Sequence, residues 1–231
     1  MIGSVDYDYG LFVRPLYGYA EADRLAGVSR GTSNRWVKGY RYWSSSGERV
    51  AQPSMTNRTE NKPEEGVSFL DLVSIKAIDG LRKMDFSTRT IRRIVQYCQD
   101  ALGMDYPLAT QTFKTDRHRV YIEAGDGYLL EVLGGQQGAQ AWDAILDPFL
   151  NTLDYQNDLA RRWWPLGKEE LVVVDPAYGF GSPVIVNSGL RTELVAERAE
   201  VGDPPEIIAY DFNLTPEQVE SALLFEEQLA A

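Results

Sequence analysis

Four polar side chains with the chemistry to contact nucleic acid recur within residues 17–40 of this 231-residue chain. Arg30, Asn34, Arg35 and Lys38 are spaced so that most of them share one face of a helix. Arginine can donate two hydrogen bonds to a guanine, asparagine can donate one to an adenine and accept one from it, and lysine can neutralise a phosphate. The pattern therefore predicts a nucleic-acid-binding helix, although an ordinary helical hairpin with a solvated basic face would produce the same spacing.

Two short helices joined by a tight turn are expected to position these side chains. Residues 20–25 suit the first helix, and Gly27 can end it because glycine adopts a positive φ without a steric penalty. Ser29 is predicted to be the N-cap of the second helix, through a hydroxyl that accepts a backbone N–H. A helix pair with glycine in the turn and a basic second helix is typical of a helix-turn-helix.

A β-hairpin is predicted directly after the helix pair. Residues 44–47, Ser-Ser-Ser-Gly, form a turn signal between two short segments that contain aromatic and β-branched residues. Arg41 and Arg49 would lie on this hairpin, and they complete the predicted DNA-binding set. The N-terminal region is therefore expected to be a winged helix-turn-helix.

The rest of the chain alternates helical and extended patterns. Helices are expected over residues 68–84, 87–102 and 139–153, and a hairpin over residues 119–133. Residues 171–174 suit a buried strand, and residues 179–183 are predicted to be a loop. Three helices follow: residues 192–201, a helix that starts near Pro205, and a helix with Thr215 as N-cap and Pro216 in its first turn.

These elements predict a mainly α fold with short β-hairpins, an α+β class. We divide the sequence into a DNA-binding region (1–103), a middle α+β region with a possible role in dimerisation (104–165) and a small acidic three-helix bundle that resembles a helix-turn-helix (166–231). One small recognition helix rarely supplies enough affinity, so a two-fold homodimer is expected.

Several functional classes are disfavoured by composition. Cys98 and His118 are the only residues of their kinds, so we expect no metal site, no catalytic triad and no cofactor, and we do not expect an enzyme. No apolar run approaches the ~18 residues that a membrane span needs, and the N-terminus lacks a signal-peptide pattern. A cytoplasmic protein is the simplest expectation.

Charge divides the chain into two unlike ends. Residues 1–62 carry nine Lys/Arg and six Asp/Glu, whereas residues 166–231 carry three and thirteen. This asymmetry indicates a nucleic-acid end and an end for another partner, although an acidic surface can also serve only solubility. The candidate partner-binding residues combine apolar groups with one carboxylate: Phe212, Leu223, Leu224, Phe225 and Glu226.

Two stretches resemble known families. Residues 17–103, with AEADRLAGVSRGTSNRW and later FLDLVSIKAIDGLRKMDFSTRTIRRIV, resemble a MerR-like DNA-binding region, with Ser33 where that pattern usually has leucine. Residues 171–228, with a G-x-P-V-I segment and PEIIAYDFNLTPEQVESAL, resemble a small bacterial family of unknown function that recurs in antitoxins. The whole chain is similar to the longer VapB-type antitoxins that join both regions.

The resemblance implies an antitoxin whose partner is a VapC-type toxin, a PIN-like ribonuclease that uses clustered carboxylates and Mg²⁺. Such a protein would neutralise the toxin and bind operator DNA to repress their shared operon. The alternative is a stand-alone MerR-like transcriptional regulator whose middle region senses a small molecule.

Overall fold

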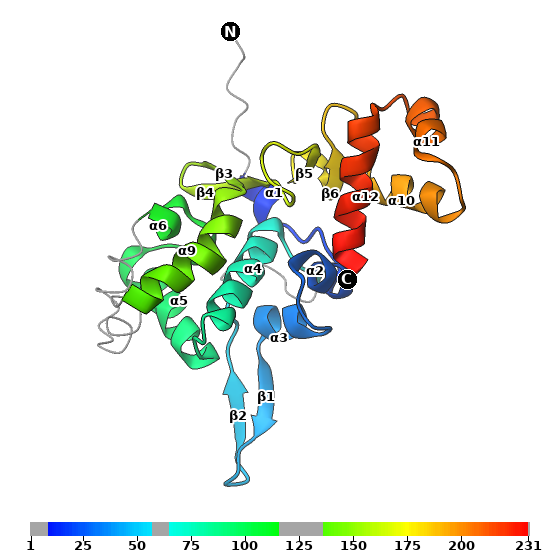
Figure 1. Ribbon diagram of the computed structural model, residues 1–231. Coiled ribbons are helices and arrows are strands. Elements are labelled where there is room, and N and C mark those ends of the chain that lie inside the picture. The colour runs from blue at the N-terminus through cyan, green and yellow to red at the C-terminus, as the bar shows by residue number, and fades with distance from the viewer. Residues whose placement is uncertain (1–8, 57–64, 116–135, 231) are drawn as a thin grey trace.

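The computed structural model describes residues 9–56, 65–115 and 136–230. It combines helices with two antiparallel sheets, one of two strands and one of four, so the predicted mixture of helices and strands is confirmed (Figure 1). The predicted hairpin over residues 119–133 and the single histidine, His118, lie outside the described residues.

The predicted helix pair and the hairpin after it are both present. A short α1 (Tyr9–Val13) precedes α2 (Tyr19–Ala26) and α3 (Thr32–Lys38), and Gly27 ends α2 with a φ of 69°. Strands β1 (Tyr40–Trp43) and β2 (Arg49–Gln52) pair in antiparallel register and project away from the helices (Figure 1).

Helix α4 (Phe69–Lys83) is the central element of the described fold. It contacts α1, α2, α3, α5 (Thr88–Leu102) and α9 (Gln136–Asn151), and most of its side chains are buried. Ser68 caps it in a reciprocal box, because its hydroxyl accepts from the Asp71 N–H and the Asp71 carboxylate accepts from the Ser68 N–H. Ser87 caps α5 and Gly103 ends it, as the sequence predicted. A 3₁₀ turn (Pro107–Ala109) and α6 (Gln111–Thr115) follow α5.

The second sheet joins two of the predicted regions. Its strands are β3 (Leu153–Gln156), β4 (Leu159–Trp163), β5 (Val172–Asp175) and β6 (Tyr178–Ile185), in that spatial order. Strands β4 and β5 pair across the predicted boundary at residue 165, with Trp163 opposite Val174. The middle and C-terminal regions are therefore connected by backbone pairing as well as by the chain.

The predicted loop over residues 179–183 is wrong, because these residues belong to β6. The glycines that suggested a loop do adopt positive φ, 71° at Gly179 and 80° at Gly181, with Phe180 between them at 55°. The strand tolerates this irregularity and Pro183 because it lies at the edge of the sheet. The Tyr17 hydroxyl donates to the Gly181 carbonyl at 2.8 Å, and burial raises the pKa of that phenol, so the bond persists at neutral pH.

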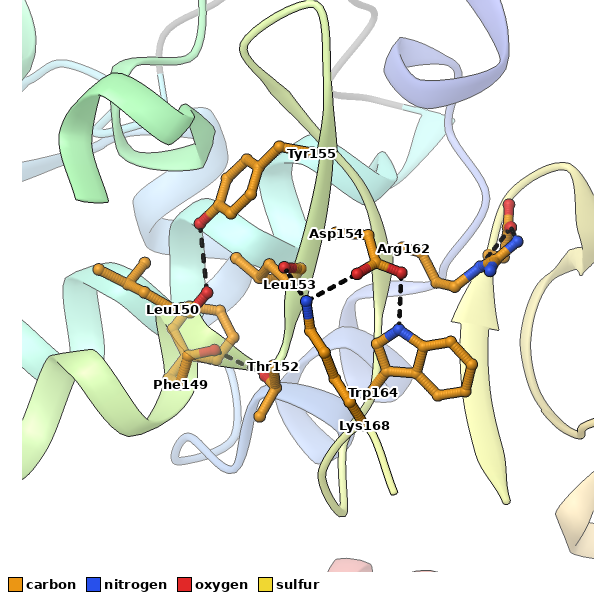
Figure 2. Close-up of polar contacts among 10 residues, drawn as sticks. Phe149, Leu150, Thr152, Leu153, Asp154, Tyr155, Arg162, Trp164 and Lys168 are labelled. Carbon is orange, nitrogen blue, oxygen red and sulfur yellow. Dashed lines mark hydrogen bonds and ion pairs between the residues drawn. The ribbon is translucent and has the colours of Figure 1, made fainter. Parts of the chain in front are cut away.

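A polar cluster fixes the connection between β4 and β5 (Figure 2). The Asp154 carboxylate on β3 accepts from the Trp164 indole at 2.8 Å and from the Lys168 amine at 2.7 Å. Partial burial opposes ionisation of Asp154, but these two hydrogen bonds prevail and lower its pKa. Lys168 also donates to the Leu153 carbonyl at 3.0 Å, which ties the connecting segment back to β3.

The described core draws on all three predicted regions. Its fully buried members include Leu72 and Ile78 of α4, Leu150 of α9 and Val172 of β5. Phe225 belongs to the same cluster although it comes from the C-terminal helix α12 (Pro216–Ala230).

A second, smaller core lies within the C-terminal region. Helices α10 (Thr192–Glu200), α11 (Pro205–Phe212) and α12 contact one another around Val195, Ile208 and Val219. Thr215 caps α12 as predicted, since its hydroxyl accepts from the Gln218 N–H while the Gln218 side chain accepts from the Thr215 N–H. Helix α12 thus serves both cores.

Candidate functional site

Helix α3 is held at its N-terminus by a carboxylate from α2. Asp23 accepts from the backbone N–H groups of Gly31 at 2.5 Å and Ser33 at 2.8 Å, and it is buried. The predicted N-cap at Ser29 is wrong, because α3 begins at Thr32 and Ser29 contributes only its carbonyl, which accepts from the Thr32 N–H. A carboxylate satisfies the free N–H groups better than a hydroxyl, because it also interacts favourably with the helix dipole. Sequence reasoning missed Asp23 because the cap lies outside the helix that it caps.

We expect the substitution Asp23→Ala to lower the free energy of unfolding by about 1–2 kcal/mol, the range of a lost helix cap. Asp23→Asn should have a smaller effect, since the amide keeps one acceptor oxygen. Urea denaturation followed by circular dichroism measures both changes. Glu48→Ala is the matched control, because it removes an exposed carboxylate from the hairpin turn and should change stability by less than about 0.5 kcal/mol. An Asp23→Ala protein as stable as the Glu48→Ala protein would contradict the assigned cap.

All six predicted DNA-binding residues are exposed on the helix pair and its hairpin. Arg30 precedes α3, Asn34, Arg35 and Lys38 lie on it, and Arg41 and Arg49 lie on β1 and β2. Within the described residues, no salt bridge engages any of the five cations in this set. Their charges are therefore available to an external anion.

The hairpin register places both hairpin arginines on one face. Arg41 pairs with Ala51 and Trp43 pairs with Arg49, and side chains two residues apart on a strand share a face. Trp43 therefore neighbours both arginines, Arg41 along its own strand and Arg49 directly across the hairpin, and 72% of its surface is exposed. Sequence reasoning assigned no role to Trp43. Surfaces that bind nucleic acid often combine an exposed aromatic ring with nearby cations, as here.

Two contacts orient the hairpin relative to the helices. Arg92 of α5 donates to the Pro53 carbonyl at 3.2 Å and lies over the Tyr40 ring, 5.8 Å from its centroid. Gly39 joins α3 to β1 with a φ of 73°, and a Cβ there would lie 2.3 Å from the Gln52 carbonyl oxygen. Only glycine permits this close approach, so the turn between α3 and the hairpin depends on it.

The predicted partner-binding residues separate into different environments. Leu223 and Glu226 line a groove of about 460 Å³ between α10 and α12, whose other walls include Ala196 and Ala199. Glu200 and Glu227 are exposed at this groove. The Glu226 carboxylate is already engaged, since it accepts from Arg24 of α2 at 3.2 Å and from the Thr192 hydroxyl at 2.5 Å.

The other three members of that set lie outside the groove. Leu224 is 45% exposed, and Phe212 is partly buried with the Arg198 guanidinium over its ring. Phe225 is only 2% exposed, so its predicted contact with a partner is not available on this surface. The error arose because α12 is covered on two sides, which the helical periodicity alone did not reveal. On α11, Ile207 and Tyr210 are also exposed, although neither was predicted to bind a partner.

The described residues contain no cluster of three or more His, Cys, Asp or Glu side chains arranged to hold a metal ion. Among the same residues, no helix is both long enough and apolar enough to cross a membrane.

Comparisons with known proteins give three similarities. Residues 172–225 match a family described as "Protein of unknown function (DUF433)". The chain is 25% identical over 222 residues to "Putative antitoxin VapB45" of Mycobacterium tuberculosis, which covers 90% of this chain and 92% of that protein. It also resembles the crystal structure of Rv2018 from Mycobacterium tuberculosis, with a TM-score of 0.62, 23% identity and coverage of 92% of this chain and 99% of the other. The chain therefore shares its fold with a solved mycobacterial protein along nearly its whole length, and its β5–α12 region resembles a family of unknown function.

Proposed function

We propose that this protein is a cytoplasmic antitoxin that neutralises a cognate VapC-type, PIN-like ribonuclease and binds the operator of their shared operon. The observation that supports it most is the similarity to a protein named as an antitoxin, which extends over 90% of the chain. The role is one of binding and involves no catalysis by this chain.

The operator would be bound by the helix pair and hairpin acting as a MerR-like winged helix-turn-helix. The exposed face of α3 would enter the major groove, where Asn34 and Arg35 can reach base edges. Arg41 and Arg49 would contact phosphates from the shared face of the hairpin. A two-fold dimer would place two such units on half-sites about 34 Å apart.

The toxin would be bound by the groove between α10 and α12. A ribonuclease needs a basic surface to bind RNA. The exposed carboxylates of Glu200 and Glu227 could pair with that surface, and they lie at the edge of an apolar floor that includes Leu223. Such charges accelerate encounter, while the apolar floor supplies most of the affinity. The groove also includes Arg24 of α2, so a toxin bound there would lie close to the helix pair.

The first test is whether the neighbouring gene encodes a small ribonuclease. If so, that nuclease should co-purify with this protein, and Glu200→Lys/Glu227→Lys should weaken the complex about tenfold or more by reversing two charges at the groove. The control Glu169→Lys/Glu206→Lys changes the net charge equally at exposed residues that do not line the groove. Calorimetric titration and rescue of growth in co-expression measure the effect.

If both double variants lose the same affinity for the nuclease, the loss is a general effect of net charge, and the nuclease does not bind at the groove. Truncation at residue 165 is a poor test, because it removes β5 from its pairing with β4 and Phe225 from the main core.

A further inference from the structure

A cavity of about 370 Å³ lies beside the helix pair, where α2, α4, β4 and α12 come together. Its apolar walls include Leu25, Val28, Trp163, Phe225 and Leu229. Its polar lining includes Asp23, Arg24 and Lys76. A volume of this size is at the lower end of the range for small-molecule sites, which are typically apolar with a few fixed polar groups.

Lys76 of α4 supplies an ammonium group without a counter-ion. Its Nζ lies 4.8 Å from the centroid of the Trp163 ring and 5.7 Å from that of Phe149, and it donates to the Ala26 carbonyl at 3.3 Å. No salt bridge among the described residues includes Lys76. Asp79, a carboxylate on the same helix that acts electrostatically on Lys76, is paired with Lys83 at 2.6 Å. An ammonium has three donors, so this one retains capacity for an acceptor inside the cavity.

The other charged groups at the cavity are already committed. Both oxygens of Asp23 accept from the backbone at the start of α3, and Arg24 is paired with Glu226. Arg24 is exposed and already pairs with a carboxylate, whereas Lys76 is partly buried and has no ion-pair partner among the described residues, so an incoming anion would be stabilised most by Lys76. Burial is the main cause of a Lys76 pKa lowered to about 8, with Asp79 opposing the shift and Lys83 adding to it. An anion in the cavity would restore part of the stabilisation that the ammonium loses on leaving water.

We infer that this cavity binds a small carboxylic acid with an apolar body, whose carboxylate pairs with Lys76 and whose body packs against Trp163 and the side chains from α2 and α12. Among the described residues, Lys76 is the one cation lining the cavity that has no ion-pair partner, which suits one negative charge, whereas a polyanion such as a nucleotide would leave charges without partners. The aromatic wall favours an aromatic body, which can contact the edge of the indole, since the Lys76 ammonium already lies over the ring. This inference does not depend on the proposed antitoxin role, because it concerns only the cavity.

The test is a calorimetric titration of the full-length protein with benzoate, phenylacetate and indole-3-acetate, each compared with its neutral amide. We expect at least one acid to bind about tenfold or more tightly than its amide, which is the scale of one charge-assisted hydrogen bond. Lys76→Met should abolish that preference while keeping a similar volume. Arg89→Met, which removes an exposed cation that does not line the cavity, should preserve it.

Proton uptake provides a second measurement on the unmodified protein, which remains informative if Lys76→Met does not fold. At pH 8.5 much of Lys76 is uncharged, so binding of a carboxylate should draw a fraction of a proton from the solvent. Titration in two buffers with different ionisation enthalpies measures this uptake. The inference is overturned if no acid binds at millimolar concentration, if acids and amides bind equally, or if binding takes up no proton.

Discussion

The double substitution Arg35→Ala/Lys38→Ala is expected to weaken operator binding by roughly 2–5 kcal/mol, if each side chain makes one good contact. Both residues lie on the exposed face of α3, and neither forms a salt bridge within the described residues. Arg35 does donate to the Thr32 hydroxyl at 3.3 Å, and Lys38 lies over the Tyr19 ring at 4.9 Å. These contacts are local, so the fold should survive the change.

Gel-shift or fluorescence-anisotropy titration at several salt concentrations gives the measurement. Since each phosphate contact adds about one unit to the salt dependence, loss of Lys38 should also flatten the slope of log affinity against log salt. The control Arg14→Ala/Arg191→Ala removes two positive charges from exposed residues outside the helix pair and hairpin. If the control loses as much affinity as the α3 variant, non-specific attraction explains the binding and α3 is not the recognition helix.

The substitution Phe225→Ala is expected to lower the free energy of unfolding by about 3–5 kcal/mol, the usual cost of deleting a buried phenylalanine. Phe225 is 2% exposed and attaches α12 to the core built around α4. Its loss removes apolar contacts and enlarges a cavity that already exists beside it. Urea denaturation measures the change in midpoint.

Leu224→Ala is the matched control, because it shortens the neighbouring side chain, which is 45% exposed, and should cost less than about 1 kcal/mol. A stability loss in Phe225→Ala that is no larger than in Leu224→Ala would show that α12 is not anchored through this ring. The predicted partner-binding set contains both Leu224 and Phe225. The comparison therefore distinguishes a residue of α12 that anchors the helix to the core from one that is exposed to a partner.

The parts of the fold that sequence predicted well are those determined by neighbours in the chain. Ser68, Ser87 and Thr215 cap their helices through bonds that span three residues, so the local pattern contains the whole interaction. The β1–β2 hairpin is likewise defined by its own turn and by residues that face each other across it. Short-range signals of this kind do not depend on the rest of the molecule.

The errors occurred where a distant segment decides the structure. Asp23 caps α3 from another helix, and residues 179–183 become a strand only because β5 lies beside them. Helix α12 has apolar side chains directed to two cores, so its amphipathic pattern could not show which of them faces solvent. The exposure of the candidate DNA-binding side chains was easier to predict, because charged side chains on a short helix face solvent by default.

The pairing of β4 with β5 bears on whether residues 172–225 could stand as a separate unit. The stretch that resembles a family of its own, residues 172–225, begins with β5 and ends at Phe225. In isolation it would have an open strand edge where β4 lies and an uncovered ring where the main core lies. A free-standing version would need a second polypeptide, or a copy of itself, to cover both. In this chain the residues before β5 cover both surfaces. Separating the chain between β4 and β5 would therefore expose an unpaired strand edge and apolar core side chains on each part.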